Sequence, residues 1–460
     1  MTNTLPSKRS GHESAVGLHK HKRSATDIGI ALLTPLLGQE FLDRYNLRDP
    51  LNRGLKYGVK QAFSAAGAST RQFKRIQGIG KPATRLKASG SDYFDLTPDD
   101  DQKMIVQTVE EFAEEILRPA AHDADAAATY PPDLIAKAAE LGITAINIPE
   151  DFDGIAEHRT TVTNALVAEA LAYGDMGLAL PILAPGGVAS ALTHWGSADQ
   201  QATYLSEFAG ENVPQACVAI AEPHPLFDPT ALKTTAVRTP SGYRLDGVKS
   251  LVPAAADAEV FIIAAQLNGK PTLFVVESST AGLTVTPDPS MGIRAAALGR
   301  VELDKVTVPL GARLGADVSE AELDRNYSEA IALSRLGWAA LAVGTSHAVL
   351  DYVVPYVKER EAFGEPIAHR QSVAFMCANI AIELDGLRLI TWRGAARAEQ
   401  GLSFAREAAL AKKLGTDKGM QIGLDGVQLL GGHGYTKEHP VERWYRDLRA
   451  LGVAEGVVVL

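Results

Sequence analysis

Apolar residues recur at helical spacing along most of this chain, and the first such pattern begins close to residue 97. The run Thr97-Pro98-Asp99-Asp100 predicts a helix start, because a capping hydroxyl, a first-turn proline and carboxylates suit the positive end of a helix. Apolar side chains from Ile105 to Ile116 then follow at helical spacing. Further helices are predicted over Pro132–Leu141, Val162–Gly174, Met176–Trp195 and Ala198–Phe208. Pro181, Pro185 and two glycines are expected to interrupt the third of these ranges.

The pattern changes to short segments rich in β-branched residues between Val213 and Pro309. Pro, Gly, Asn or Asp bounds each segment, and Ser241-Gly242 and Asn268-Gly269 are typical of hairpin turns. Strands are predicted at Ala216–Ala221, Thr234–Arg238, Gly242–Lys249, Val260–Leu267, Pro271–Glu277, Leu283–Pro287 and Val301–Val308. No strand pattern precedes this region. The sequence therefore predicts an all-helical domain followed by a small β-barrel or β-sandwich.

Helical periodicity returns near Ser319 and continues to the last residues. Its long amphipathic stretches are Glu320–Arg360, Gln371–Gln400 and Phe404–Leu430, and consecutive long helices favour an antiparallel bundle. The predicted fold is mainly α with a central β-domain. The expected parts are a basic N-terminal arm at 1–91, a helical domain at 92–212, a β-domain at 213–317 and a C-terminal helical bundle at 318–460.

Charge separates the arm from the rest of the chain. The first 90 residues contain 16 Lys and Arg against five Asp and Glu, whereas the remainder contains 29 against 50. The acidic body disfavours nonspecific nucleic-acid binding. Three interpretations of the arm stay open: a basic amphipathic helix over Asn52–Lys74 on an anionic membrane surface, an organelle-targeting segment, or a solvated, disordered arm. Glu40, Asp43 and Asp49 count against a typical transit peptide.

Cysteine content and hydropathy limit the cellular compartments that are expected for this protein. Cys217 and Cys377 indicate neither a metal motif nor a disulfide framework, so a reducing compartment is expected. No apolar run is expected to reach the roughly 20 residues of a membrane span. The expected location is cytoplasmic, with peripheral membrane contact if the arm lies on a surface, or mitochondrial if the arm is a targeting segment. His433 and His439 lack a third ligand at a suitable spacing, so no metal site is predicted.

The densest group of candidate functional residues lies at the end of the chain. In order these are Gln428, Gly431-Gly432-His433-Gly434-Tyr435, Glu438, Pro440, Arg443, Arg446-Asp447 and Glu455-Gly456. A glycine pair lets a backbone approach another surface closely. Glu455 lies in the apolar sequence Leu451–Leu460, and a desolvated carboxylate is a useful base near neutral pH. The competing interpretation is an exposed glutamate at a frayed terminus.

This C-terminal pattern resembles the signature of the acyl-CoA dehydrogenases, and the helical, β, helical order of residues 92–460 is similar to their architecture. The resemblance implies that Glu455 removes the α-proton of an acyl-CoA while the β-hydrogen passes to flavin as hydride, which leaves a trans-2-enoyl-CoA. It also implies that the Glu455 backbone N–H and a flavin hydroxyl polarise the thioester oxygen beside Gly456. The family generally has threonine after Glu-Gly. Here the β-branched run Val457–Leu460 follows, and it is expected to be loosely held.

A second motif, Arg360-x-x-Phe363-Gly364-x-Pro366-Ile367-x-x-x-Gln371, closes the first long C-terminal helix. An arginine beside an aromatic ring suits a pyrophosphate and a stacked base, although an arginine at a helix C-terminus is common. The motif resembles the family residues that hold the adenine dinucleotide end of FAD from a neighbouring subunit. The residues that resemble the companion loop are Gln428, Leu429, Gly431 and Gly432. The resemblance therefore implies FAD, and it implies a homodimer or homotetramer because the site needs two chains.

The β-domain departs from the family pattern beside the flavin. Ala221-Glu222-Pro223 replaces Thr-Glu-Pro, and His224–Asp228 replaces a Gly-Ala-Gly-Ser-Asp run. Leu251-Val252-Pro253 replaces Trp-Ile-Thr, and proline can donate no hydrogen bond. These changes put the tuning of the flavin in doubt, while apolar walls are retained. The residues expected along the flavin ring are Ile220, Ala221, Phe227, Leu251 and Pro253.

Arg335 aligns with an arginine that family members use against the CoA adenine and phosphates, although Ala332 replaces the acidic residue usually three positions earlier. The competing interpretation is a helix-surface arginine. The favoured function is an FAD-dependent acyl-CoA dehydrogenase that passes electrons to an electron-transferring flavoprotein. Two alternatives stay open. One is a catalytically impaired subunit that completes the FAD site of a partner chain in a hetero-oligomer, and the other is an acyl-CoA oxidase.

Overall fold

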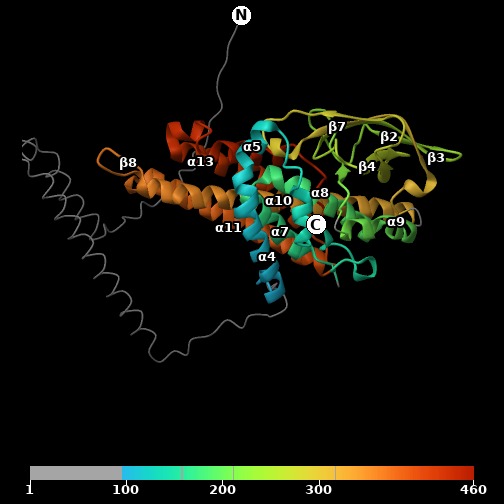
Figure 1. The fold of residues 1–460 in the computed structure, drawn as a ribbon, viewed down its shortest axis with the longest axis horizontal. Helices are drawn as coiled ribbons and strands as arrows, with labels where there is room; N and C mark the ends of the chain where they lie inside the picture. The colour runs from blue at the N-terminus through green and yellow to red at the C-terminus, as the bar shows by residue number, and fades with distance from the viewer. Residues whose placement is uncertain (1–95, 157–158, 211, 316–317) are drawn as a thin grey trace, which may run out of the picture. The chain divides into compact units, whose positions relative to one another are not determined.

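The computed structural model describes residues 96–156, 159–210, 212–315 and 318–460 (Figure 1). The basic arm, with its predicted membrane-surface or targeting segment, lies outside the described residues. The elements below belong to one compact unit that begins at Tyr93.

The first domain is helical, as predicted. Its helices are α4 (Asp100–Phe112), α5 (Arg118–Ala127), α6 (Leu134–Glu140), α7 (Thr161–Gly174), α8 (Met176–Trp195) and α9 (Ala198–Ala209). Helix α4 begins two residues later than the Thr97 signal suggested, because Asp99 forms the cap. The Asp99 carboxylate accepts from Gln102 N at 2.8 Å, and the Gln102 side chain accepts from Asp99 N at 3.1 Å. The patterns missed α5, which continues from α4 through a π-helical turn at Ala113–Leu117 and has Pro119 in its first turn.

Helix α8 contradicts two expectations. It runs unbroken from Met176 to Trp195 although Pro181 and Pro185 lie inside it. Pro185 has no N–H for the carbonyl of Pro181, and that carbonyl accepts instead from Gln215 Nε2 at 3.2 Å. By length and composition α8 is also apolar enough to cross a membrane, contrary to the sequence expectation, and 89% of its apolar window is buried inside the protein.

The β-domain is a seven-stranded sheet at the predicted place in the chain. Its strands are β1 (Ala216–Ala219), β2 (Thr235–Thr239), β3 (Gly242–Val252), β4 (Val260–Leu267), β5 (Lys270–Glu277), β6 (Leu283–Pro287) and β7 (Gly299–Pro309). They are ordered β1-β4-β2-β3-β7-β6, with β5 paired to β4. Strands β2 and β3 form a hairpin, and β1 is parallel to β4. The predicted strands are therefore confirmed, with ends that differ by a few residues.

The C-terminal part is a helical bundle. Its elements are α10 (Glu320–Glu359), the hairpin β8 (Glu361–Ala362) and β9 (Glu365–Pro366), α11 (Gln371–Glu399), α12 (Ala405–Leu414), α13 (Met420–Leu430) and α14 (Val441–Leu448). The predicted single stretch Phe404–Leu430 is α12 and α13, joined by a π-helical turn at Gly415–Gly419. Helix α10 packs against α7 on one side and against α11, α12 and α13 within the bundle (Figure 1).

The last residues are firmly packed, so the expectation of a loosely held end is wrong. After a 3-10 turn at Arg449–Gly452 the chain becomes extended, and Val457 N donates to Val218 O at 3.2 Å. The segment Val457–Leu460 is buried. A Cβ on Gly187 of α8 would lie 2.2 Å from Val457 O, and one on Gly337 of α10 would lie 2.6 Å from a Val458 methyl. Val457 has a φ of +71° and Val458 N donates to Gly456 O at 3.0 Å, so the run is held by a tight turn and by close packing, without a helix.

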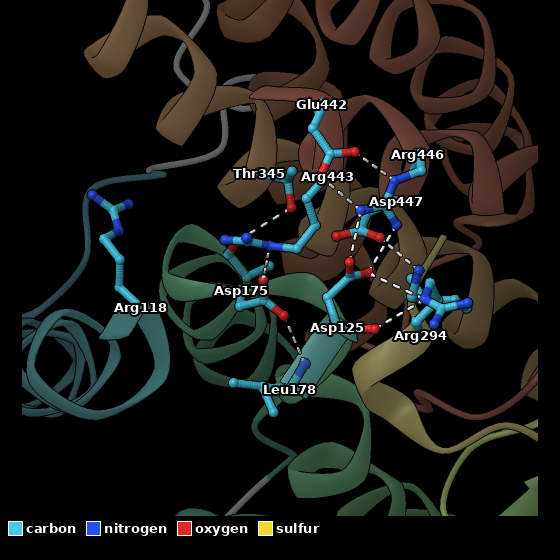
Figure 2. A network of polar contacts seen from close by, with 12 residues as sticks. Arg118, Asp125, Asp175, Leu178, Arg294, Thr345, Glu442, Arg443, Arg446 and Asp447 are labelled. Atoms are coloured by element: carbon cyan, nitrogen blue, oxygen red, sulfur yellow. Dashed lines mark hydrogen bonds and ion pairs between the residues drawn. The ribbon is translucent and has the colours of Figure 1, made fainter. Parts of the chain in front are cut away.

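A mostly buried polar network joins residues of the three domains (Figure 2). We call it the three-domain junction, and its members are Asp125, Asp175, Arg294, Arg443, Arg446 and Asp447. Arg446 holds both oxygens of Asp125 at 2.8 Å, and Arg443 Nε lies 2.9 Å from Asp175. Ile293 N of the β-domain donates to Asp447 at 2.5 Å. The charged residues of α14 thus fix the helix that leads to Glu455.

Candidate active site

Glu455 lies where the C-terminal segment crosses α10. Its side chain is only 10% exposed, which excludes the exposed, frayed interpretation. Arg335 of α10 forms an ion pair with it: Nη2 lies 2.9 Å from Oε1, and Nε lies 3.1 Å and 3.3 Å from the two oxygens. The expectation of an apolar setting for this carboxylate is therefore wrong, because an arginine that is distant in sequence faces it.

The backbone after Glu455 is held from two sides. The Gly456 carbonyl accepts from Ser334 Oγ at 2.7 Å and from Trp338 Nε1 at 2.9 Å, both on α10. Gly456 has a φ of +86°, and a Cβ there would lie 3.1 Å from the side chain of Ile220. Glycine is therefore required by the local backbone and by the approach of the β-domain. The predicted residues Ile220 and Gly456 are in this way brought together.

Lys412 of α12 is the functional candidate that the sequence patterns missed. Its Nζ donates to the carbonyl of Ala454, the residue before Glu455, at 2.5 Å. Burial lowers the pKa of Lys412 to about 8, against the opposite influence of the Glu455 charge, while Arg335 lowers the pKa further. The neighbouring Lys413 is exposed and pairs with Asp417. Two adjacent lysines in a helix gave no signal as to which one would be buried.

A loop of the β-domain approaches the same carboxylate. Tyr327 of α10 donates to Pro229 O at 2.6 Å, and burial, with the nearby charge of Glu455, raises the pKa of this tyrosine. Hydrogen bonds from Thr230 and the charge of Arg335 lower the pKa of Asp228. Phe227 is partly buried in this loop, with its ring centroid 5.5 Å from that of His224. The loop that replaces the family's glycine-rich run is therefore ordered beside Glu455.

The residues just beyond β1 and β3 that were predicted beside the flavin use their carbonyls within the protein. Lys249 Nζ donates to Ile220 O at 3.1 Å and to Glu222 at 2.9 Å, and Ser250 N donates to Ala221 O at 3.0 Å. Burial opposes the charge of Glu222, but Lys249 and further hydrogen bonds outweigh it and lower the pKa of Glu222 to about 2. The buried Pro253 accepts from Cys217 Sγ at 2.8 Å. Ala221 and Pro253 thus offer packing surface, while neither has a side-chain donor.

Leu251 lies in a cleft of about 310 Å³ between the β-domain and the bundle. Its backbone has a φ of +56°, and Leu251 N donates to Asp288 Oδ2 at 3.0 Å. No sequence motif marked the other large apolar residues of this cleft, which are Met291, Ile293, Met420 and Val453. Val453 lies two residues before Glu455 in the chain, and a cleft with these apolar walls could receive a flat apolar ring.

A larger cavity of about 710 Å³ contains the second group of predicted residues. Six of the seven line it: Arg360, Phe363, Gln428, Leu429, Gly431 and Gly432. Gln371 is not among the lining residues, whereas its neighbours Arg370 and Ser372 are. The role of Gln371 at the cofactor therefore stays a prediction.

The shape and charge of this cavity suit an adenine dinucleotide. Phe363 is 96% exposed, and the Arg370 guanidinium lies 5.5 Å from its ring centroid. Gly431 has a φ of +58°, and no protein atom lies within 4 Å of the Cβ position of Gly431 or Gly432. Two guanidinium groups, a free aromatic face and open glycine backbone together match phosphates and a stacked base. We name this group the dinucleotide clamp; its members are Arg360, Phe363, Arg370, Gln428, Leu429, Gly431 and Gly432.

The two histidines near the clamp pair with tyrosines. The rings of His433 and His439 are stacked with centroids 5.6 Å apart. His433 Nδ1 lies 3.1 Å from the Tyr356 hydroxyl, and His439 Nδ1 lies 2.7 Å from that of Tyr352. Among the described residues, no group of three His, Cys, Asp or Glu side chains could hold a metal ion.

Three family domains match the chain in order. They are described as Acyl-CoA dehydrogenase N-terminal domain at residues 99–212, middle domain at residues 217–306 and C-terminal domain at residues 325–457.

Known proteins are similar over most of their length. The chain is 31% identical to cyclohex-1-ene-1-carbonyl-CoA dehydrogenase of Geobacter metallireducens, over 78% of this chain and 94% of that protein. A chain in a structure titled as an electron transferring flavoprotein of Acidaminococcus fermentans superposes with a TM-score of 0.72 at 28% identity, over 79% and 96% of the chains. A structure titled as the FAD complex of PigA gives a TM-score of 0.71 at 25% identity, over 78% and 95%.

Proposed function

This chain belongs to the acyl-CoA dehydrogenase family, and we propose that Glu455 is the base that removes the α-proton of an acyl-CoA thioester. FAD is the cofactor, and when bound it supplies the hydride-accepting chemistry that completes oxidation of a CH–CH bond to the trans-2-enoyl-CoA. The remaining steps are those of the chain's own residues. The observation that carries the proposal is a nearly buried carboxylate, fixed at the contact of all three domains.

Arg335 prepares the base. The Arg335 guanidinium lies 2.9 Å from the Glu455 carboxylate, and this two-pronged, charge-assisted contact fixes where the carboxylate points. This contact supports a role for Arg335 in positioning Glu455, in place of the CoA contact suggested by the resemblance. The carboxylate would turn from Arg335 toward the α-carbon when a thioester enters.

The thioester oxygen needs hydrogen-bond donors because α-proton removal shifts negative charge onto it. Within the described part of the chain, the Glu455 backbone N–H donates to no acceptor. Its place next to the base makes it the donor that we assign to this oxygen. The Gly456 carbonyl, held by Ser334 and Trp338, keeps the next peptide unit from rotating.

The dinucleotide clamp would hold the adenine end of FAD, with Arg360 and Arg370 toward the phosphates and Phe363 against the adenine ring. It shares no lining residue with the cleft that contains Leu251, which favours a homodimer or homotetramer in which two chains meet at one cofactor. Helix α11 supports this assembly. It exposes Phe375, Ile382 and Leu389 at seven-residue spacing, an apolar stripe typical of a helix–helix interface. An electron-transferring flavoprotein is the proposed acceptor.

A catalytically impaired subunit is the second candidate. It is favoured by Ala221 and Pro253, which offer no side-chain donor to the flavin. An absorption spectrum of the protein purified alone separates the two candidates. We expect a flavin spectrum that bleaches when an acyl-CoA is added without oxygen. A colourless protein that gains no flavin on reconstitution would promote the partner-subunit function.

A further inference from the structure

Lys412 is a half-buried cation that the proposed chemistry leaves without a role. Its ammonium donates to the Ala454 carbonyl at 2.5 Å, and within the described residues it forms no ion pair. Burying an ammonium against a neutral carbonyl costs stability compared with leaving it in water. The adjacent Lys413 shows that α12 can keep a lysine in solvent at almost the same place. A cost of this kind is common at functional sites.

We propose that Lys412 is a positioning residue that polarises the Ala454–Glu455 peptide and so strengthens the Glu455 N–H as a donor to the acyl-CoA thioester oxygen. This inference rests on the proposed function. It adds a third element to the site, because α12 carries Lys412 whereas α10 carries Arg335 and Ser334.

The Ala454 carbonyl and the Glu455 N–H belong to the same planar amide, and in a trans amide they point in opposite directions. Lys412 occupies the carbonyl side, which leaves the N–H side free for substrate. A charged donor on the carbonyl draws electron density from the nitrogen, and hydrogen bonds in such a chain strengthen one another.

The charges around Lys412 agree with this role. Glu455 on the C-terminal segment and Arg335 on α10 are the charged groups that influence it, with opposite signs. The loop carboxylate Asp228 also feels the charge of Arg335, so the site holds charges of both signs, and Lys412 is the cation that contacts the Ala454 carbonyl. A cation on that carbonyl supports the peptide N–H that stabilises the negative charge developing on a thioester oxygen during α-proton removal.

The test measures the thioester carbonyl directly. FAD-loaded protein would be mixed with a 3-thia-acyl-CoA labelled with ¹³C at the carbonyl, which binds but has no hydrogen at position 3 to transfer. The carbonyl stretch would be followed by isotope-edited infrared spectroscopy in wild type, Lys412→Met, Lys412→Arg and the matched control Lys413→Met. Turnover of an acyl-CoA and the melting temperature would be measured on the same samples.

We expect the bound carbonyl to absorb at lower frequency than free ligand in wild type and Lys413→Met. The downshift should be smaller in Lys412→Met and partly restored in Lys412→Arg. The expected fall in kcat for Lys412→Met is on the order of tenfold with KM little changed. This is less than the roughly 10²–10³ of losing an oxyanion donor outright, because the N–H remains.

If the bound carbonyl absorbs at the same frequency in Lys412→Met as in wild type, the inference is overturned. If the melting temperature of that variant is also lowered, Lys412 has a structural role only. If Lys412→Met does not fold, the carbonyl frequency of the bound ligand is compared between Lys412→Arg and Lys413→Met. Equal frequencies in these two variants would overturn the inference. Failure of the proposed function looks different. A wild type without flavin or turnover, whose bound ligand still shows a Lys412-dependent shift, would overturn the dehydrogenase function and leave the polarisation standing.

Discussion

The surroundings of Glu455, which we call the base pocket, are enclosed, whereas the dinucleotide clamp is exposed, although one cofactor would contact both. Around Glu455, strands of the β-domain, α8, α10, α12 and the C-terminal segment close on a side chain that is 10% exposed. The clamp stands on a short hairpin and a glycine turn, and its Phe363 is 96% exposed. One chain therefore completes the base pocket, whereas the clamp leaves free surfaces for another molecule.

Substitution of the base should have the largest effect and should act on the pocket alone. Glu455→Gln keeps the shape and removes the basicity, so turnover should fall by about 10²–10⁴-fold while FAD stays bound. Stopped-flow bleaching of the flavin measures the rate, and binding of a 3-thia-acyl-CoA checks that the pocket is intact. A variant with wild-type turnover would show that another group is the base.

Removal of a clamp arginine should give the complementary result. Arg360→Ala loses a charge-assisted phosphate contact worth about 1.5–3 kcal/mol, so FAD affinity should fall by roughly 10- to 100-fold. Fluorescence of released FAD on dilution measures this, with circular dichroism as the check on the fold. The exposed Arg406 of α12 provides a control, since Arg406→Ala should retain FAD. Unchanged FAD affinity combined with loss of helical structure would make Arg360 a structural residue.

The close packing of α8 against the C-terminal segment can be tested by substitution of Gly187. Gly187→Ala would place a Cβ 2.2 Å from Val457 O, so the C-terminal segment must shift, at a cost of about 1–3 kcal/mol. We expect a lower melting temperature and a lower kcat, with FAD affinity nearly unchanged. Gly386→Ala on α11 is the control, because nothing lies within 4 Å of its Cβ position and alanine favours a helix. Equal effects of the two variants would contradict the close contact.

The three-domain junction should respond to pH. Burial and the charge of Asp175 raise the pKa of Asp447 to about 8, against the influence of Ile293 N, Arg443 and Arg446. Because the folded-state pKa lies above the unfolded value, this proton stabilises the fold most at low pH, and the gain is lost as pH rises through 8. Relative to Asp447→Asn, wild type should lose roughly 1 kcal/mol or less between pH 7 and pH 8. Urea unfolding at each pH measures the free energy of unfolding of both proteins. If that free energy changes equally with pH in wild type and Asp447→Asn, Asp447 does not hold a proton in the folded protein.

The sequence predicted most of the local structure. The hairpin turns, the β-branched runs and the helical periodicity placed the strands and all three long C-terminal stretches, because these signals act between neighbouring residues. The motif residues of the dinucleotide clamp also meet in one cavity, with the exception of Gln371. The sequence failed at Pro181 and Pro185, where Gln215 from another element satisfies the carbonyl that a proline leaves free.

For this protein, the sequence by itself determined the order of the domains, the family resemblance and the identity of the glutamate at the end of the chain. The tertiary structure decided what surrounds that glutamate. Arg335 and Lys412 lie 120 and 43 positions before it, and they reach it only because α10 and α12 pack against the C-terminal segment. Packing also made the run Val457–Leu460 an ordered wall. Burial and charge pairing depend on contacts between distant residues, which a local pattern does not contain.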